Sequence, residues 1–168
     1  MKLLKFLPNR VWRVYRGGAC LDRLRGIANP ADGSFPEEWI ASTVAAQNPQ
    51  RDCPGEGISR VLLPDGSAER FDRMLEREAE TLLGPDHPAS AGRTPGFLTK
   101  LLDSAIRLPV QAHPDREASR RLFCSPYGKT EAWIVLEGRR INGEEPYLLM
   151  GFNDRFDFEV FRREALTA

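Results

Sequence analysis

The chain has 168 residues with 24 basic and 24 acidic side chains, so its formal net charge is zero. A neutral chain is a poor candidate for binding nucleic acid, because that binding needs a basic surplus to displace counterions. The length is typical of one domain that forms its own core. Three widely spaced cysteines without a C-x-x-C pair indicate reduced thiols rather than a disulfide scaffold.

The N-terminal residues do not have the pattern of a signal peptide. Their short apolar run is interrupted by Lys5 and ended by Pro8, and no small-residue cleavage site follows. Nowhere does the chain approach the run of about 18 apolar residues that a membrane span needs. We therefore expect a cytoplasmic protein that does not bind membranes.

The first 83 residues predict short strands followed by one helix. Glycine, proline and asparagine interrupt residues 1–60 every few positions, which favours short strands and long loops over helices. Residues 58–63 read as a strand that ends at the turn Pro64-Asp65-Gly66. Residues 69–83 predict an amphipathic helix ending at Gly84, because their apolar side chains recur at helical spacing. This stripe consists of Phe71, Met74, Leu75, Ala79, Leu82 and Leu83.

The second half predicts further strands, a hairpin and a last helix. Asn142-Gly143 is a strong signal for a two-residue hairpin turn. Asp154 or Asp157 can cap the last helix, whose inner face would carry Phe158, Phe161 and Ala165. Together the elements predict a mainly β fold, a sandwich or jelly roll decorated by a few helices. The remaining expected elements are strands at 97–103, 106–112, 132–136 and 147–152 and a helical turn at 115–122.

Three polar residues form a candidate metal site. Gln111 and His113 are two positions apart, so on a strand they point the same way, and Glu131 opens a second strand. An amide oxygen, an imidazole nitrogen and a carboxylate can bind one Zn²⁺ ion. A rival interpretation joins His113 and Asp115 with His87 in a two-histidine, one-carboxylate iron site. A third is an ordinary surface histidine without a ligand role.

Three motifs in this region resemble type I mannose-6-phosphate isomerases, zinc enzymes of the cupin superfamily. The motifs are FLTKLLD at 97–103, VQAHPD at 110–115 and GKTEAW at 128–133. Their order agrees with the family pattern, and the spacing from Glu131 to Gly138 matches the cupin E-x6-G spacing.

Two weaker matches extend the resemblance toward the N-terminus. Gly17-Gly18 resembles the family's W-G-G-x-x-L opening, although Tyr15-Arg16 stand where its tryptophan is expected. Residues 37–42, EEWIAS, resemble the family's G-E-x-W-x-x-S segment, with Pro36 in place of the glycine. The resemblance therefore covers most of the chain.

The resemblance implies a fold, a reaction and the residues that perform it. The fold would be a cupin-type jelly roll, and the reaction the interconversion of mannose 6-phosphate and fructose 6-phosphate by proton transfer between C2 and C1. Gln111, His113 and Glu131 would be ligands of one Zn²⁺ per chain. Lys129 would bind the sugar phosphate and assist catalysis, and Ser42 would contribute a substrate-binding hydroxyl.

One departure from the family concerns the metal ligands. The family has a further zinc-binding histidine in a P-x-G-x-x-H strand, and this chain has no histidine after Glu131. We therefore expect residues 1–168 to correspond to the N-terminal part of such a cupin domain, with the C-terminal remainder absent, an incomplete ligand set and impaired isomerase activity. Two alternatives are a non-catalytic sugar-phosphate-binding cupin module and one half of a split enzyme that assembles with a separately encoded C-terminal half.

Overall fold

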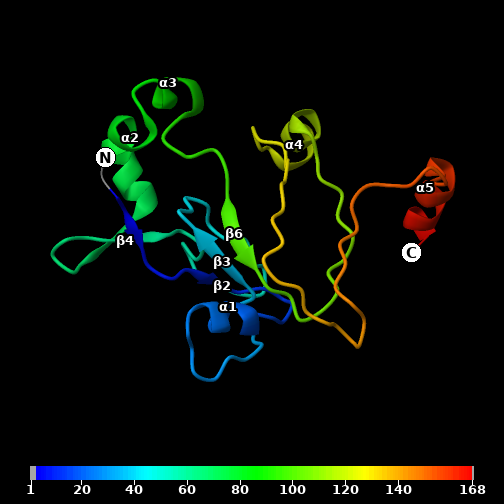
Figure 1. Ribbon diagram of the computed structural model, residues 1–168. Coiled ribbons are helices and arrows are strands. Elements are labelled where there is room, and N and C mark those ends of the chain that lie inside the picture. The colour runs from blue at the N-terminus through cyan, green and yellow to red at the C-terminus, as the bar shows by residue number, and fades with distance from the viewer. Residues whose placement is uncertain (1–2, 168) are drawn as a thin grey trace. The chain divides into compact units, whose positions relative to one another are not determined.

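The computed structural model describes residues 3–167 and divides the chain into two compact units, residues 1–107 and 108–168 (Figure 1). The chain forms two small antiparallel sheets and a few helices, with 25% of the residues in helices and 15% in strands. Within residues 3–167 no helix has both the length and the apolar character needed to cross a membrane.

The first sheet of unit 1 carries the main hydrophobic core. Its strand order is β1-β4-β5, and both pairings are antiparallel. Strand β4 confirms the strand predicted at 58–63, and the turn that follows it also forms, because Gly66 N donates to Leu63 O over 3.0 Å. The strands are β1 (Lys5–Phe6), β4 (Arg60–Leu62) and β5 (Ala68–Arg70).

Helix α2 (Phe71–Leu83) packs its apolar stripe against this sheet, as the helical spacing predicted. Phe71 meets Phe6 of β1 edge to face, with the ring centroids 5.0 Å apart. Met74 and Leu75 are almost completely buried. Burial of such a stripe removes water from apolar surface and is the main source of stability in this part of the unit. A short helix, α3 (His87–Ala91), follows.

The second sheet has β3 (Glu37–Ile40) in its centre, between β2 (Arg10–Val11) and β6 (Thr99–Leu102). Both pairings are antiparallel, and β6 confirms the strand predicted at 97–103. Trp39 of β3 is buried at 5% exposure. The sheet thus places a tryptophan and two glutamates of one strand in the interior of unit 1.

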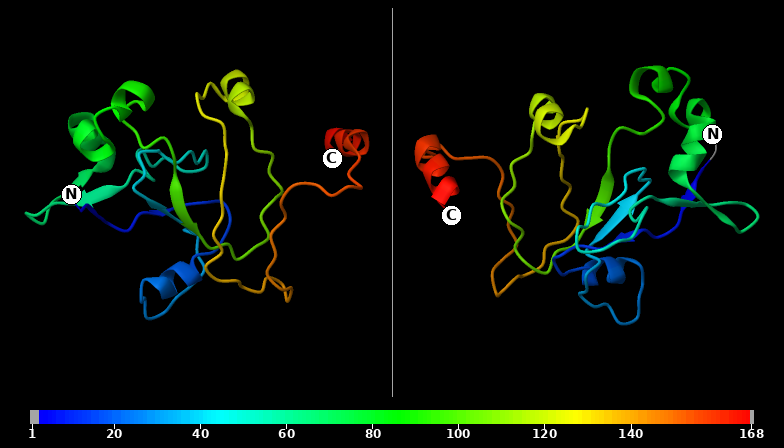
Figure 2. Two further views of the ribbon diagram at one scale, coloured as in Figure 1. Left: turned by 45° about the horizontal axis from the view of Figure 1, so that its top comes forward. Right: turned by 180° about the vertical axis from the view of Figure 1, so that it is seen from behind.

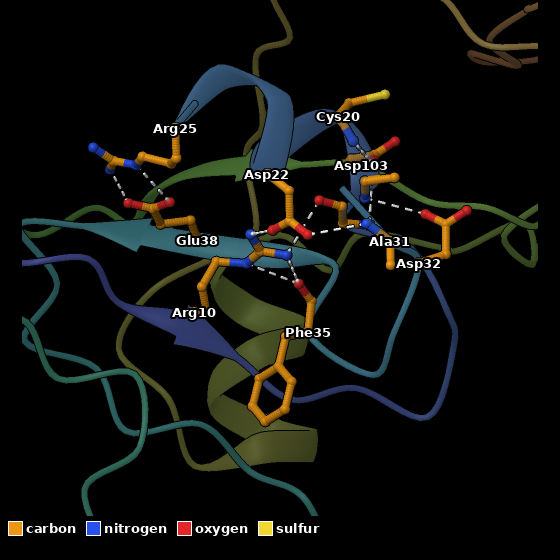
Figure 3. A network of polar contacts seen from close by, with 11 residues as sticks. Arg10, Cys20, Asp22, Arg25, Ala31, Asp32, Phe35, Glu38 and Asp103 are labelled. Atoms are coloured by element: carbon orange, nitrogen blue, oxygen red, sulfur yellow. Dashed lines mark hydrogen bonds and ion pairs between the residues drawn. The ribbon is translucent and has the colours of Figure 1, made fainter. Parts of the chain in front are cut away.

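Helix α1 (Ala19–Leu24) departs from the expectation that residues 1–60 favour short strands and long loops over helices. A distant side chain caps it, because Asp103 Oδ2 accepts hydrogen bonds from Gly18 N at 3.0 Å and Cys20 N at 2.7 Å (Figure 3). Asp22 of α1 also pairs with Arg10 of β2 at 2.9 Å. These partners lie far from α1 in sequence or on another element, so local residue spacing does not reveal the helix.

Gly57 is a position where both the backbone and the available space require glycine. Its φ is +88°, and a Cβ there would lie 2.7 Å from two ring carbons of Trp39. We expect Gly57→Ala to lower the free energy of unfolding by about 2–4 kcal/mol, the sum of left-handed backbone strain and overpacking. Urea denaturation measures this loss.

The matched control for this substitution is Gly66→Ala. Gly66 also has a positive φ, +84°, but a Cβ there would meet no heavy atom within 4 Å beyond its own chain neighbours. This variant should lose only the strain component, about 1–2 kcal/mol. Equal losses in the two variants would show that the contact with Trp39 is not what demands glycine at position 57.

Unit 2 contains two helices and a hairpin turn joined by irregular segments (Figure 2). Helix α4 (Arg116–Phe123) confirms the helical turn predicted at 115–122, and helix α5 (Phe158–Thr167) confirms the last helix. Asp157 caps α5, since its Oδ1 accepts from two backbone amides, those of residues 159 and 160. The predicted turn forms with φ of 53° at Asn142 and 82° at Gly143, the left-handed values that a type I′ turn needs.

Three strands predicted in the second half are wrong, because residues 106–112, 132–136 and 147–152 form no strand. A strand needs a hydrogen-bonded neighbour, and an isolated hairpin is marginal in water. The inner face predicted for α5 is also wrong: Phe158 and Phe161 are 64% and 48% exposed. Beyond the turn itself, residues 108–167 thus form none of the sheet that their sequence pattern favours.

Candidate functional site

Two extended segments of unit 2 bring together the four residues proposed for catalysis and metal binding. Gln111 and His113 precede α4, whereas Lys129 and Glu131 follow it. The segments are joined by a hydrogen bond of 2.9 Å from Lys129 N to Pro114 O.

Gly128 permits this close approach of the two segments. A Cβ at that position would lie 3.1 Å from the backbone nitrogen of Arg116 and 3.2 Å from the carbonyl oxygen of Pro114. Such separations are tighter than ordinary van der Waals contact. The glycine before Lys129 therefore sets how closely the lysine and Glu131 approach the segment of Gln111 and His113.

The four side chains form one polar cluster. Lys129 Nζ lies 3.2 Å from Gln111 Oε1 and 3.4 Å from Glu131 Oε1. The other carboxylate oxygen of Glu131 lies 3.8 Å from His113 Nε2 and accepts a hydrogen bond of 3.2 Å from the Trp133 indole. The side chains of Lys129 and His113 are 46% and 32% exposed. An ion pair so accessible to water adds only about 0–1 kcal/mol to stability, so the cluster is not needed to hold the fold.

The donor set is compatible with a divalent cation. Two ligands of a tetrahedral zinc ion, each about 2.0–2.2 Å from the metal, lie about 3.4 Å from each other. The 3.8 Å between His113 Nε2 and Glu131 Oε2 is close to that separation. The amide oxygen of Gln111 and a carboxylate oxygen of Glu131 already share one cationic group, the ammonium of Lys129.

Of the three proposed ligands, His113 and Glu131 belong to the residue types that most often bind metals, whereas Gln111 does not. Within residues 3–167, no group of three or more His, Cys, Asp and Glu side chains is arranged to hold a metal. The candidate site contributes two such residues, His113 and Glu131, and its third donor is the amide of Gln111.

Ser42, the proposed substrate-binding hydroxyl, lies in unit 1 and is completely buried. Its Oγ donates to Val44 O at 3.2 Å and accepts from Val44 N at 3.0 Å. Ser59 Oγ accepts from the backbone amide of Ser42 at 2.9 Å. The hydroxyl therefore closes a local turn and offers no exposed atom to a ligand in this conformation.

The residues of the rival iron site have other contacts. His87 belongs to unit 1, where its Nε2 lies 2.7 Å from Thr94 O. Asp115 caps α4 by accepting a hydrogen bond of 2.8 Å from Ala118 N. These contacts give both side chains structural roles in this conformation.

A second polar cluster, in unit 1, has no counterpart in the sequence predictions. Glu37 is only 3% exposed. Its carboxylate accepts hydrogen bonds from Tyr15 Oη at 2.6 Å, Trp39 Nε1 at 2.7 Å and the Arg13 guanidinium at 3.1 and 3.2 Å. Lys100 Nζ lies 3.6 Å away. Glu37 and Trp39 are two apart on one strand and share a face, but their partners come from other segments, which sequence spacing cannot show.

This cluster shifts two pKa values in opposite directions. Burial acts to raise the pKa of Glu37, but the hydrogen bonds from Tyr15 and Arg13 and the charge of Lys100 outweigh it and hold that pKa below its usual value. Burial raises the pKa of Tyr15, and its hydrogen bond to the Glu37 carboxylate raises it further. Glu37 is therefore a charged, fully paired carboxylate in the interior of the unit.

Comparison with protein-family models, with curated proteins and with solved structures finds no match to this chain. Functional interpretation consequently depends on the residues themselves and on the contacts described above.

Proposed function

We propose that this chain is a relative of type I mannose-6-phosphate isomerases and takes part in the metal-dependent interconversion of mannose 6-phosphate and fructose 6-phosphate. The observation that carries the proposal is the clustering of Gln111, His113, Lys129 and Glu131 through contacts of 3.2–3.8 Å. The motif resemblance points to the same four residues independently of these contacts. The two antiparallel sheets and the hairpin turn are compatible with the cupin-type jelly roll that the proposal includes.

The proposed ligands suit proton transfer beside a carbonyl group. Gln111, His113 and Glu131 would hold one divalent cation, and with a single negative charge among them they leave one of its two positive charges uncompensated. Such a cation acts as a Lewis acid and stabilises the negative charge that develops on oxygen when the proton is removed. Lys129, at 46% exposure, is accessible to a sugar phosphate and would orient it by charge-assisted hydrogen bonds.

Proton exchange with solvent is the most sensitive test, because it detects C–H cleavage even when complete turnover is slow. Mannose 6-phosphate is incubated in D₂O with the wild-type chain and Zn²⁺, and deuterium at C2 is followed by proton NMR. We expect exchange that depends on both the chain and the metal. Lys129→Met should reduce its rate about 10–100-fold, and Lys5→Met, a substitution in β1, should leave it unchanged.

Two other outcomes would contradict the isomerase proposal. If mannose 6-phosphate binds in a Lys129-dependent manner but no deuterium enters, the chain is a non-catalytic sugar-phosphate-binding module. If neither binding nor exchange is found with Zn²⁺ present, the cluster around Lys129 does not act on sugar phosphates.

A further inference from the structure

Three pairs in the chain join an aspartate or asparagine to a following glycine, and the structure distinguishes one of them. The pairs are Asp32-Gly33, Asp65-Gly66 and Asn142-Gly143. In such a pair the backbone nitrogen of the glycine can attack the side-chain carbonyl carbon of the preceding residue, because glycine has no Cβ to hinder the approach. The attack depends on the hydrogen bonds of that nitrogen, on the charge of the side chain and on the freedom of the backbone to rotate.

The first aspartate pair is held in place within unit 1. Gly33 N donates a hydrogen bond of 2.9 Å to Gly17 O, which occupies the attacking nitrogen. Asp32 Oδ1 accepts a hydrogen bond of 3.1 Å from Ala19 N, which orients the carboxylate toward α1. Both reacting groups are therefore engaged elsewhere as long as this part of the chain stays folded.

The second aspartate pair is held in the turn after β4. Gly66 N donates to Leu63 O at 3.0 Å. The hydroxyl and the backbone amide of Ser67 donate to Asp65 Oδ1 and hold the pKa of that carboxyl below its usual value. A carboxylate that stays ionised is a poor electrophile, so this pair is also unreactive.

Asn142-Gly143 differs from both aspartate pairs. Among the contacts of residues 3–167, neither Gly143 N nor the Asn142 side chain has a hydrogen-bond partner. The carboxamide of Asn142 carries no charge that would repel a nucleophile, and a Cβ at Gly143 would meet no heavy atom within 4 Å. The left-handed backbone at Asn142, with φ of 53°, keeps Gly143 N away from the side-chain carbon, so the reaction requires the turn to open.

The turn that holds this pair has few interactions to keep it closed. Two backbone hydrogen bonds join Ile141 and Glu144, at 3.2 and 3.0 Å. The ion pair of Arg140 and Glu145 is exposed and adds little. Within residues 108–167 no strand extends the pairing, and an isolated hairpin is marginal in water. The charged sequence EGRRINGEE at 137–145 is typical of a loop that faces solvent.

We propose that Asn142-Gly143 is a site of spontaneous covalent modification, at which Asn142 loses ammonia and becomes aspartate or isoaspartate. Gly143 N forms a bond to Asn142 Cγ while the carboxamide C–N bond breaks, and the carboxamide nitrogen leaves as ammonia with the proton of Gly143 N. Water then opens the resulting succinimide ring. Attack of water at the backbone carbonyl carbon leaves the chain running through Cγ, which is isoaspartate. This proposal is independent of the isomerase proposal.

The modification would change both the charge and the geometry of the turn. Either product adds a negative charge beside Glu144 and Glu145, in a chain whose formal net charge is zero. Isoaspartate also lengthens the backbone by one methylene group, which a two-residue turn closed by Ile141 and Glu144 does not accommodate. The turn therefore persists only in chains that keep Asn142 unmodified or convert it to ordinary aspartate.

Peptide mapping of the full chain tests the proposal. The protein is incubated in mildly alkaline buffer, with and without urea, and isoaspartate is labelled by an isoaspartate-specific carboxyl methyltransferase with tritiated S-adenosylmethionine. We expect label at residue 142 in the folded chain, at a rate within about threefold of that in urea, because the turn gives little protection. At Asp32, the matched pair in unit 1, urea should raise the rate at least about tenfold.

Gly143→Ala separates the chemical step from opening of the turn. The added methyl group hinders the attacking nitrogen and should lower the rate about tenfold or more, although it also strains a backbone with φ of 82° and favours the open turn. An unchanged or faster rate in this variant would overturn the proposal. So would a larger effect of urea at residue 142 than the one expected, or the absence of label there in the folded chain.

Discussion

His113→Ala should weaken Zn²⁺ binding about 100-fold or more if His113 is a ligand of the proposed site. The imidazole is the only nitrogen donor in a set whose other members, Gln111 and Glu131, bind through oxygen. Zinc in a site with so few protein ligands depends strongly on each of them. Competition with a chromogenic chelator at neutral pH measures the affinity directly and does not require turnover.

The chain provides a matched control for this experiment in its second histidine. His87→Ala removes an imidazole that contacts Thr94 O in unit 1, and the zinc affinity should not change. Glu131→Gln keeps the shape of the side chain but removes its charge, so an intermediate loss is expected. Equal affinity in the wild type and in His113→Ala would exclude the assigned ligand set.

Glu37→Gln should lower the free energy of unfolding by about 2–4 kcal/mol at neutral pH. The substitution removes a buried negative charge that holds Arg13, Tyr15 and Lys100, and hydrogen bonds to charged groups are worth about 1.5–3 kcal/mol each. It also leaves the two cations near Glu37 without their counter-charge. Urea denaturation of the wild type and of the variant measures the loss. Glu76→Gln, on the exposed side of α2, is the control and should change stability little.

The pH dependence of stability gives a separate readout for Glu37. Because the pKa of this carboxyl is lower in the folded chain than in the unfolded one, the folded state binds fewer protons, and its advantage is complete above the unfolded pKa of about 4.3. This stability is lost as the pH falls through the folded value. Below about pH 4, wild-type stability should therefore decline more steeply than that of Glu37→Gln. Parallel profiles would show that Glu37 does not supply the acid-sensitive part of the stability.

Local signals predicted those elements that local interactions determine. The apolar stripe from Phe71 to Leu83 was sufficient for α2, and Asn142-Gly143 was sufficient for a turn whose two residues need positive φ. Helix α1 was missed because its cap is Asp103, a residue more than 80 positions away. The strands predicted at 132–136 and 147–152 failed for a related reason, since strand propensity cannot form a strand without a partner.

The candidate site was predictable only as a list of residues. Residue patterns suggested Gln111, His113 and Glu131 and the family resemblance added Lys129, but neither showed that the lysine bridges the amide and the carboxylate. The family resemblance also implied a substrate-binding role for Ser42, and in the structure its hydroxyl is buried in a turn. Hydrogen-bond partners depend on how separate segments pack together, and that information is absent from the spacing within any one segment.

The cap that Asp103 provides for α1 also constrains the order of folding. A six-residue helix is unstable alone, because the few hydrogen bonds it forms do not offset the cost of nucleation. Asp32 accepts from Ala19 N at 3.1 Å, but the amides of Gly18 and Cys20 gain the Asp103 carboxylate only after the end of β6 has reached them from a distant part of the chain. We therefore expect α1 to become ordered late, after β6 has joined the sheet. Because the contact between Asp103 and α1 joins residues that are far apart in the sequence, its formation should be a slow step in the folding of unit 1.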